Sequence, residues 1–337
     1  MFRYFGSKHS SATQVAKLVR QDFSGSTAAD AFGGLGTIGA VLKSNGFKVT
    51  TCDVLQMPNA FQHARIVCQN RPRFSRLREQ TKLKTSDDVL QHLNTRRAER
   101  SWLVSEFSEQ RPFFTCENAT RIAGAWNAIK RWEDAGLLTE SDRKFLVASF
   151  LNSMDPCANT AGTYYAYLKH WHRKALRPFH MKWIPVQAGV AGGQAMIGDA
   201  LDCLKGKAFD LLYLDPPYNS RDYSRYYHLP ESLASLTRPD TNPESMSGVP
   251  KKMLDASPLI RKSAEASYLV ELISQVHWKR LVVQYSDGSH IPMDQLREML
   301  REKGKLQEHI LPTLGYTTLA KARQHQHHVF IVDHATR

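Results

Sequence analysis

The N-terminal part of the chain alternates between strand-like and helix-like spacing of its apolar residues. A short run of small and apolar residues at 28–32 predicts a strand, and a glycine-rich turn separates it from a predicted helix at 37–43. A second strand is predicted at 48–52 and closes on Asp53. Strand, glycine turn, helix and strand in this order predict the first βαβ unit of a doubly wound parallel sheet.

A helical pattern replaces this alternation from about residue 69 to residue 190. Within it, Thr139 and Asp142 form a weaker version of the capping box and predict the start of a helix. Three apolar residues then recur on one face of that helix, at Leu146, Phe150 and Met154. The pattern predicts a mostly helical insertion at 69–190.

Strands and helices alternate again after the insertion. The letters AMIGDALDCL and a buried strand at 210–214 come first, followed by leucines at helical spacing, Leu229, Leu233 and Leu236. A stretch rich in proline, serine and lysine at 238–258 predicts a long loop. The letters RLVVQYSDG, MDQLREMLREKG and HVFIV then predict a strand, a helix that Gly304 stops, and a final strand.

These patterns together predict an α/β fold with one catalytic domain. Residues 1–68 and 191–337 form this domain, the helical insertion 69–190 interrupts it in sequence, and the loop 238–258 lies within its C-terminal half. A chain of 337 residues is long enough for such an arrangement.

The distribution of charge indicates a nucleic-acid partner. Lysine and arginine number 45 against 32 acidic residues, which gives a net charge of +13. No carboxylate occurs between Asp155 and Asp199, where aromatic residues are interleaved with cations, among them Lys169, Arg173, Lys174 and Arg177. A solvated basic face is the simpler explanation of most charge runs, but this composition favours a surface for a phosphate backbone.

Cysteine use and hydropathy indicate a cytoplasmic protein without metal. The five cysteines form no CxxC pair, which predicts reduced thiols and argues against a zinc site. The histidines of the letters HQHH at 325–328 lack clear acidic or cysteine partners, so we predict no metal there. No apolar run approaches the about 18 to 20 residues that cross a bilayer, so no membrane partner is expected.

The glycine-rich turn predicts a cofactor site without identifying the cofactor. Gly34, Gly36 and Gly39 fit the dinucleotide-binding pattern G-x-G-x-x-G, with Asp53 as the acid for the ribose. The same turn fits D-x-F-x-G-x-G through Asp30 and Phe32, a pattern that binds S-adenosyl-L-methionine. Glycine spacing alone leaves a nicotinamide oxidoreductase and a methyltransferase both open.

Asp215, Pro216, Pro217 and Tyr218 follow the predicted strand 210–214 and favour the methyltransferase. The lone pair of an exocyclic base amine is delocalised, so its nitrogen is a poor nucleophile. A carboxylate and a backbone carbonyl that accept its two N–H bonds would aim the lone pair at a methyl donor. Prolines make the chain rigid there, and an aromatic ring can stack on a base taken out of the duplex. These four residues are the predicted catalytic residues.

The motifs together resemble the Dam-like class of adenine-specific N6 DNA methyltransferases, the branch seen in type II restriction-modification methylases and their phage or orphan relatives. The likeness runs nearly end to end, and the letters RYFGSK, DAFGGLG, GDA and YLDPPYNSRDY carry it. It implies a Rossmann-like S-adenosylmethionine-dependent methyltransferase sheet with an inserted target-recognition region. It also implies double-stranded DNA as substrate, base flipping, a separately encoded cognate restriction endonuclease, and the cytoplasm of a prokaryotic or phage-infected cell.

The resemblance assigns roles to residues of this chain. Those implied to contact S-adenosyl-L-methionine are Tyr4, Lys8, Asp30, Phe32, Gly34, Gly36, Asp53, Asp199 and Asp215. Asn219 and Arg221 are expected to shape the catalytic loop or contact a phosphate, and Tyr226 or Tyr227 either borders the flipped base or packs in the core.

Other activities remain as alternatives. Aspartate at the first position of the catalytic motif favours adenine N6, with cytosine N4 and RNA adenine next. Pro156-Cys157 is similar to the nucleophile of cytosine-C5 enzymes, but a structural cysteine is favoured because D-P-P-Y would be redundant for C5 chemistry. A catalytically silent DNA-binding relative would have broken motifs, whereas both motifs are intact.

Overall fold

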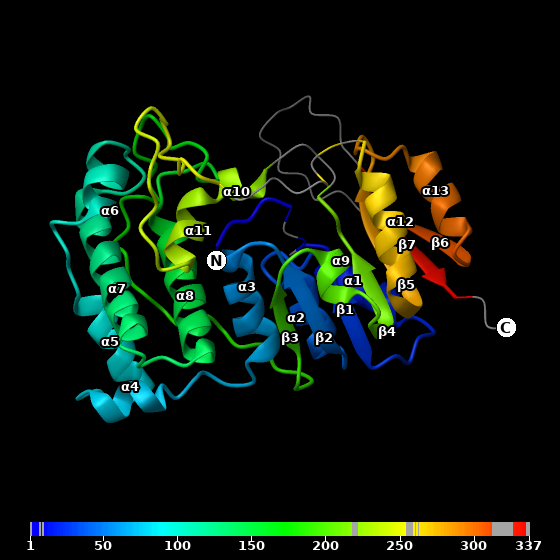
Figure 1. The fold of residues 1–337 in the computed structure, drawn as a ribbon, viewed down its shortest axis with the longest axis horizontal. Helices are drawn as coiled ribbons and strands as arrows, with labels where there is room; N and C mark the ends of the chain where they lie inside the picture. The colour runs from blue at the N-terminus through cyan, green and yellow to red at the C-terminus, as the bar shows by residue number, and fades with distance from the viewer. Residues whose placement is uncertain are drawn as a thin grey trace. The chain divides into compact units, whose positions relative to one another are not determined.

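The computed structural model describes residues 2–6, 8, 10–217, 222–253, 259, 261, 263–311 and 326–334. The chain folds into two compact units, each formed by three separate parts of the sequence, as the colours of Figure 1 show. The sheet unit comprises Lys8–Val54, Gln187–Asp222 and Ala256–Arg337. The helical unit comprises Met1–Ser7, Leu55–Val186 and Tyr223–Asp255.

In the described residues, the sheet unit contains one seven-stranded sheet in the order β3-β2-β1-β4-β5-β7-β6. The strands are β1 (Thr27–Asp30), β2 (Lys48–Asp53), β3 (Gln194–Ile197), β4 (Ala208–Leu214), β5 (His277–Ser286), β6 (Lys305–Leu311) and β7 (His327–Asp333). Neighbours from β3 to β5 are parallel, and β7 runs antiparallel to both β5 and β6. The predicted α/β fold class is confirmed.

Helices cover this sheet, as its sequence requires. They are α1 (Ala12–Arg20), α2 (Thr37–Ser44), α9 (Ala200–Leu204), α12 (Glu265–Gln275) and α13 (Met293–Arg301). Leu281, Val282 and Val283 of the interior strand β5 are all fully buried, so both faces of the sheet are covered there. Such a continuous apolar run is typical of parallel strands that carry helices on both sides.

A buried arginine joins three parts of the sheet unit. Arg280 of β5 lies opposite Asp333 of β7 and contacts its carboxylate in a bidentate manner, at 2.7 and 2.8 Å. The remaining nitrogen, Nη1, donates to the carbonyl oxygens of Val19 and Gln21 at the end of α1. Because two parallel N–H bonds to one carboxylate also fix orientation, this contact holds the antiparallel edge in register.

The helical unit is built from short and medium helices. They are α3 (Gln56–Gln62), α4 (Ser75–Gln80), α5 (Ser86–Thr95), α6 (Trp102–Val104), α7 (Cys116–Asp134), α8 (Glu140–Met154), α10 (Tyr223–Tyr226) and α11 (His228–Ala234). Two π-helical turns, η1 (His63–Val67) and η2 (Ser105–Glu109), and the 3₁₀ turn η3 (Asp155–Cys157) complete the unit. Among the described residues, no helix is long and apolar enough to cross a membrane.

The boundaries of the units differ from the predicted domains 1–68, 69–190 and 191–337. Residues 55–68 and 223–253 belong to the helical unit rather than with the sheet. One contact that joins these two segments is a cap from Glu231 of α11, whose carboxylate accepts from the amides of Gln56 and Met57 at the start of α3, at 2.7 and 2.8 Å. Of the loop predicted at 238–258, residues 254–258 lie outside the described residues. Its first part is fastened to η2, since Arg238 and Thr241 both donate to Glu106.

The predicted start of helix α8 is confirmed as a capping box. Thr139 Oγ1 accepts from the amide of Asp142 at 3.1 Å, and Asp142 Oδ2 accepts from the amide of Thr139 at 3.1 Å. We expect Thr139→Ala to lower the free energy of unfolding by about 1 kcal/mol. Urea unfolding measures this, with Thr237→Ala, an exposed site outside any helix, as a control expected to change it by under about 0.5 kcal/mol. Equal midpoints for the two variants would contradict the capping role.

Candidate active site

The order of the strands selects one edge of the sheet as the place for a ligand. From β1 the chain moves outward to β2, and from β4 it moves the other way to β5, while β1 and β4 lie side by side and parallel. Ligands of open α/β sheets bind outside the carboxyl ends of the strands at such a switch point. The turn at 33–36 follows β1 and Asp215 follows β4, so the fold brings the two predicted motifs to this point.

The glycine turn presents backbone at the start of α2. The amide of Gly33 donates to the Cys52 carbonyl at 3.0 Å, and the amide of Gly36 donates to Gly33 at 2.7 Å. Gly34 and Gly36 have φ of +47° and +70°, which side chains with a Cβ rarely adopt. Gly36 is also the N-cap of α2 and offers no side-chain cap, while the amide of Gly39 in the first turn of α2 hydrogen-bonds to Asp30.

Asp30 places a buried carboxyl group at the end of β1. Its side chain is only 1% exposed, and both oxygens lack a hydrogen bond of ordinary geometry within the described structure. Burial, followed by the charges of Asp215 and Asp53, raises the pKa of Asp30 to about 7, and the amides of Gly39 and Phe32 offset this only in part. Three carboxyl groups therefore converge where β1, β2 and β4 end, and a cationic ligand would relieve their repulsion.

The two carboxylate oxygens of Asp215 have different environments. Oδ2 accepts from Lys8 Nζ at 2.7 Å, and both side chains are largely buried. Oδ1 is buried and has no hydrogen-bond partner in the described part of the chain. Burial raises the pKa of Asp215, and the Lys8 ammonium opposes that rise by favouring the carboxylate. The site thus holds one oxygen in place and leaves the other to accept a bond from a ligand.

Comparison with known proteins decides which class of enzyme carries this site. Residues 4–286 match the family of D12 class N6 adenine-specific DNA methyltransferases. The chain belongs to this family. The resemblance seen in the sequence is confirmed, and membership of a methyltransferase family decides against the nicotinamide alternative that glycine spacing left open.

Individual relatives are type II methyltransferases and modification methylases by name. The chain is 25% identical over 308 residues to type II methyltransferase M.FokI of Planomicrobium okeanokoites, which covers 90% of this chain and 47% of that protein. It is 26% identical over 298 residues to type II methyltransferase M.NlaIII of Neisseria lactamica, covering 87% and 84%. Modification methylase LlaI of Lactococcus lactis is 24% identical over 89% of this chain. The chain spans about half the length of M.FokI and LlaI.

The rest of the predicted methyltransferase cofactor site lies where β2 and β3 end. Asp53 lies opposite Ile197 in the strand pairing, and Asp199 follows two residues later. Asp199 Oδ1 accepts from the amide of Leu201 and from Tyr268 Oη, at 2.9 and 2.5 Å, so this carboxylate caps α9. The ring of Phe32 lies 6.3 Å from that of Tyr268. The fold brings Asp30, Phe32, Asp53 and Asp199 to one edge, and their contacts with a cofactor stay predictions.

Two exposed apolar side chains at this edge were not predicted. Val54 follows Asp53 and is 48% exposed, and Ile197 ends β3 and is 41% exposed. Apolar side chains at the carboxyl ends of adjacent strands can hold a flat ring of a ligand. In the sequence each is a single apolar residue at the end of a strand or directly after it, and it looks the same as a buried core residue. Only the exposure of these two side chains in the structure distinguishes them from core residues.

The helical unit contains other residues that the sequence analysis singled out. The ring of Tyr4 lies 4.8 Å from that of Tyr227, which is fully buried. Tyr227 therefore packs in the core, whereas Tyr226 is partly exposed. Cys157 is 2% exposed, burial raises the pKa of its thiol to about 12, and it donates to the Met154 carbonyl. The prediction of a structural cysteine agrees with this environment.

The residues predicted to contact DNA differ in the exposure of their charged groups. Lys169, Arg173 and Arg177 are exposed, but Lys174 Nζ is buried without a hydrogen-bond partner in the described structure. A direct phosphate contact by Lys174 is thus at odds with its position, because its ammonium does not reach the surface. Tyr218, Asn219 and Arg221 lie outside the described residues. Of the histidines at 325–328, His325 also lies outside them, and His328 Nδ1 contacts Glu308 at 2.7 Å.

Proposed function

We propose that this chain is a site-specific DNA adenine N6 methyltransferase that uses S-adenosyl-L-methionine as methyl donor. One observation carries the proposal: Asp215 Oδ1 is a buried acceptor without a hydrogen-bond partner in the described residues, at the switch point of a methyltransferase sheet. A buried acceptor that stays unpaired costs free energy, so it is typical of a site that a ligand completes. The N–H group of an everted adenine suits this oxygen.

The chain's own residues would activate the adenine amine by position and charge. Asp215 Oδ1 accepts one N6–H bond, and the carbonyl of Pro216 or Pro217 accepts the other, so the lone pair points away from both acceptors. Pro216 is buried and its ring restricts φ, which keeps the carbonyls in place. Tyr218 is expected to stack on the base. Orientation and preorganised charge would supply most of the catalysis, without a covalent bond to the enzyme.

The chemistry of the site fits S-adenosyl-L-methionine. This cofactor, when bound, supplies a methyl group on a sulfonium cation. The positive sulfur suits the edge where Asp30, Asp53 and Asp215 converge. Gly34 and Gly36 would let a ligand approach the backbone, and Asp53 would accept from ribose hydroxyls. Val54 and Ile197 would contact the adenine ring of the cofactor, Asp199 would lie near that ring, and Lys8 and Tyr4 complete the proposed set.

Cofactor affinity should depend on pH through Asp30. Its pKa of about 7 in the free protein is raised, so below pH 7 the group is mostly protonated. A bound cation favours the carboxylate, lowers its pKa and releases a proton, so binding tightens as pH rises through 7 and then levels off. We expect about a tenfold gain in affinity between pH 6 and pH 8. Calorimetry in two buffers of different ionisation enthalpy measures both the affinity and the proton release.

Asp30→Asn is the variant that tests this dependence, since the amide does not titrate. It should bind the cofactor with an affinity that varies little between pH 6 and 8, and with no proton release. Asp22→Asn, in an exposed turn of the same unit, should behave as wild type. An Asp30→Asn protein that keeps the full pH dependence would show that another group is responsible.

We infer double-stranded DNA as the substrate and a separately encoded restriction endonuclease as the partner. Exposed Lys169, Arg173 and Arg177 in a segment without carboxylates support contact with phosphates, and affinity should then fall as salt rises. Such a substrate supports action in the cytoplasm of a prokaryotic or phage-infected cell. Target recognition by the helical insertion is part of the same proposal.

Incubation of the protein with unmethylated plasmid and labelled cofactor tests the proposed function. Modification-sensitive sequencing of the product would show N6-methyladenine at every copy of one short sequence. N4-methylcytosine instead would support the cytosine alternative. Label transferred to RNA but not to duplex DNA would support the RNA alternative. An unmodified plasmid under conditions where the cofactor binds would overturn the proposal.

A further inference from the structure

Two tyrosines of the helical unit form an exposed ring pair. The ring centroids of Tyr165 and Tyr226 are 5.2 Å apart and the planes are inclined by 33°. Tyr165 is 52% exposed and Tyr226 is partly exposed, whereas their chain neighbours Tyr164 and Tyr227 are fully buried. Neighbouring rings held together at a surface offer a flat apolar face, which is the feature that a nucleobase stacks on.

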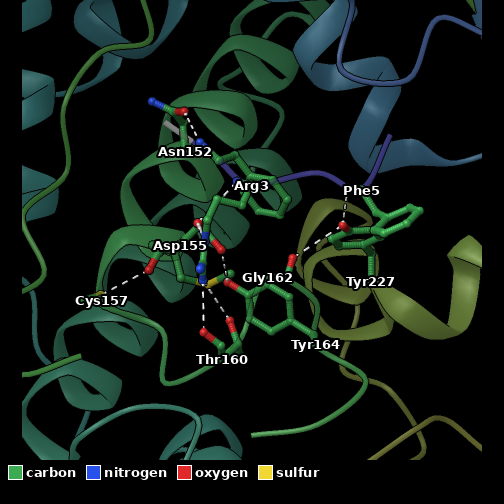
Figure 2. A network of polar contacts seen from close by, with 11 residues as sticks. Arg3, Phe5, Asn152, Asp155, Cys157, Thr160, Gly162, Tyr164 and Tyr227 are labelled. Atoms are coloured by element: carbon green, nitrogen blue, oxygen red, sulfur yellow. Dashed lines mark hydrogen bonds and ion pairs between the residues drawn. The ribbon is translucent and has the colours of Figure 1, made fainter. Parts of the chain in front are cut away.

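A partly buried polar network fixes the loop that carries Tyr165 (Figure 2). Arg3 Nη2 donates to the carbonyl of Thr160 at 3.1 Å, and Arg3 Nε contacts Asp155 at 3.4 Å. Tyr227 Oη accepts from the amide of Phe5 at 2.7 Å and donates to the carbonyl of Gly162 in the same loop at 3.4 Å. Because these contacts lie just before Tyr165 in the chain, they restrict the position of its ring.

Asn159 holds the other end of this loop. Its side-chain Nδ2 donates to the carbonyl of Leu168 at 3.0 Å, and its Oδ1 accepts from the amide of His172 at 3.0 Å. Thr160 and Tyr167 also pair as an antiparallel bridge. The loop from 160 to 167 is therefore closed at its base, with Tyr165 near its far end.

Hydrogen bonds of Tyr164, the neighbour of Tyr165, join the two segments that carry the ring pair. The amide of Tyr164 donates to the carbonyl of Tyr226 at 2.7 Å, and His228 Nε2 lies 3.0 Å from the carbonyl of Tyr164. The ring pair is thus set before any ligand arrives. A ligand that stacks on preorganised rings loses little side-chain entropy, which favours binding.

The chain segments that carry the pair contain exposed cations. Tyr165 lies in the stretch between Asp155 and Asp199 that has no carboxylate, and Lys169 and Arg173 of that stretch are exposed. Arg225, next to Tyr226 in the chain, is also exposed. Cations for phosphates beside aromatic rings for bases are the two components of surfaces that bind unpaired nucleotides.

We propose that Tyr165 and Tyr226 form a stacking platform for an unpaired base of the DNA substrate. The platform belongs to the helical unit, whereas Asp215 and the glycine turn belong to the sheet unit. The proposal rests on the proposed function, because extrusion of a base from a duplex is what creates unpaired bases.

The test compares two duplexes in their binding to the full chain. One carries 2-aminopurine opposite an abasic position, so the fluorescent base is unpaired, and the other is fully paired. Wild type should bind the first duplex more tightly and quench its fluorescence by stacking. Tyr165→Ala and Tyr226→Ala should lose roughly 5- to 100-fold in affinity for the first duplex and most of the quenching, with little change for the paired duplex. Tyr165→Phe should retain both properties.

Matched variants separate stacking from charge. Lys169→Ala should weaken binding to both duplexes and leave quenching intact. It should also reduce the slope of log affinity against log salt concentration by about one. Trp171→Ala, at a 44% exposed ring of the same segment, should keep the preference for the unpaired base. Thermal unfolding of each variant establishes that it is folded.

The outcomes distinguish this proposal from the proposed function. A folded Tyr165→Ala protein that discriminates and quenches like wild type overturns the platform, whether or not the protein methylates plasmid DNA. A wild type that neither binds DNA nor methylates it overturns both proposals. Plasmid methylation by wild type, together with loss of discrimination in both alanine variants and its retention in Tyr165→Phe, supports the platform.

Discussion

Asp215→Asn is expected to lower the rate of methyl transfer by roughly 10²- to 10³-fold while the protein still folds and binds cofactor. The variant keeps the shape of the side chain but removes the charge that Oδ1 and Oδ2 share. A neutral amide polarises the adenine amine less, and its NH₂ group is a donor where an acceptor is needed. Single-turnover methylation of duplex DNA measures the rate, and calorimetry measures cofactor binding.

Asp210→Asn is the matched control, because Asp210 lies in the first half of β4, the strand that Asp215 follows. Its carboxylate accepts from the amides of Ser26 and Thr27 and contacts Lys279 at 2.7 Å, and these contacts, the Lys279 bond first, hold the pKa of Asp210 well below its usual range. We expect this variant to lose about 1 to 3 kcal/mol of stability and to retain turnover. Near-normal turnover in Asp215→Asn would contradict the proposed role of Asp215.

Lys8→Met is expected to move the acid limb of the rate–pH profile to higher pH. Burial already raises the pKa of Asp215, and Lys8 opposes the rise at a distance of 2.7 Å. Without the ammonium, burial acts unopposed, the pKa of Asp215 rises further, and less carboxylate is present at neutral pH. At saturating cofactor we expect a loss of about 10- to 100-fold in kcat at pH 7 that is partly recovered at pH 9.

Two further variants distinguish an effect of Lys8 on the pKa of Asp215 from a role of Lys8 in cofactor binding. Lys8→Arg keeps a positive charge near Asp215 and should shift the profile much less, while Lys17→Met, at an exposed lysine of the same unit, should match wild type. If Lys8 served only to hold the cofactor, Lys8→Met would raise the KM for cofactor and leave both kcat at saturation and its pH profile unchanged. That outcome would remove Lys8 from the control of Asp215.

Much of the sheet unit is predictable from local pattern. The strand and helix predictions at 28–32, 37–43 and 48–52 correspond to β1, α2 and β2 with shifts of one or two residues at their ends. Strand β6 was not predicted, because it is an antiparallel edge strand in which only Leu311 is buried, so it has no apolar run. Polar edge strands protect a sheet from further pairing, and the same polarity conceals them in a sequence.

The domain boundaries depend on contacts between residues far apart in the chain, which the local spacing of apolar and polar residues does not reveal. The predicted domains place residues 55–68 with the sheet, yet the cap supplied by Glu231 joins α3 to α11 within the helical unit. Local spacing cannot reveal a cap supplied by a carboxylate so distant in the chain. The segment 238–253 joins the helical unit for a similar reason, since Arg111, which is 6% exposed, donates to the carbonyl of Ser245.

The candidate site was predictable as a set of residues but not as a geometry. The motifs identified Asp30, Asp53 and Asp215, and the sheet order brings all three to one edge. The pairing of Lys8 with Asp215 was not foreseen, because the motif implied only that Lys8 contacts the cofactor. The open Oδ1 of Asp215 and the raised pKa of Asp30 arise from burial, which residue identities alone do not determine.

A structure of the protein with an unreactive S-adenosylmethionine analogue and its target duplex tests the central claim most directly. It should show an everted adenine with N6 about 2.6 to 3.2 Å from Asp215 Oδ1 and from a carbonyl of Pro216 or Pro217. The remaining face of N6 should point at the sulfur of the analogue. An adenine that stays in the duplex, or an Asp215 carboxylate that contacts neither base nor cofactor, would contradict the account.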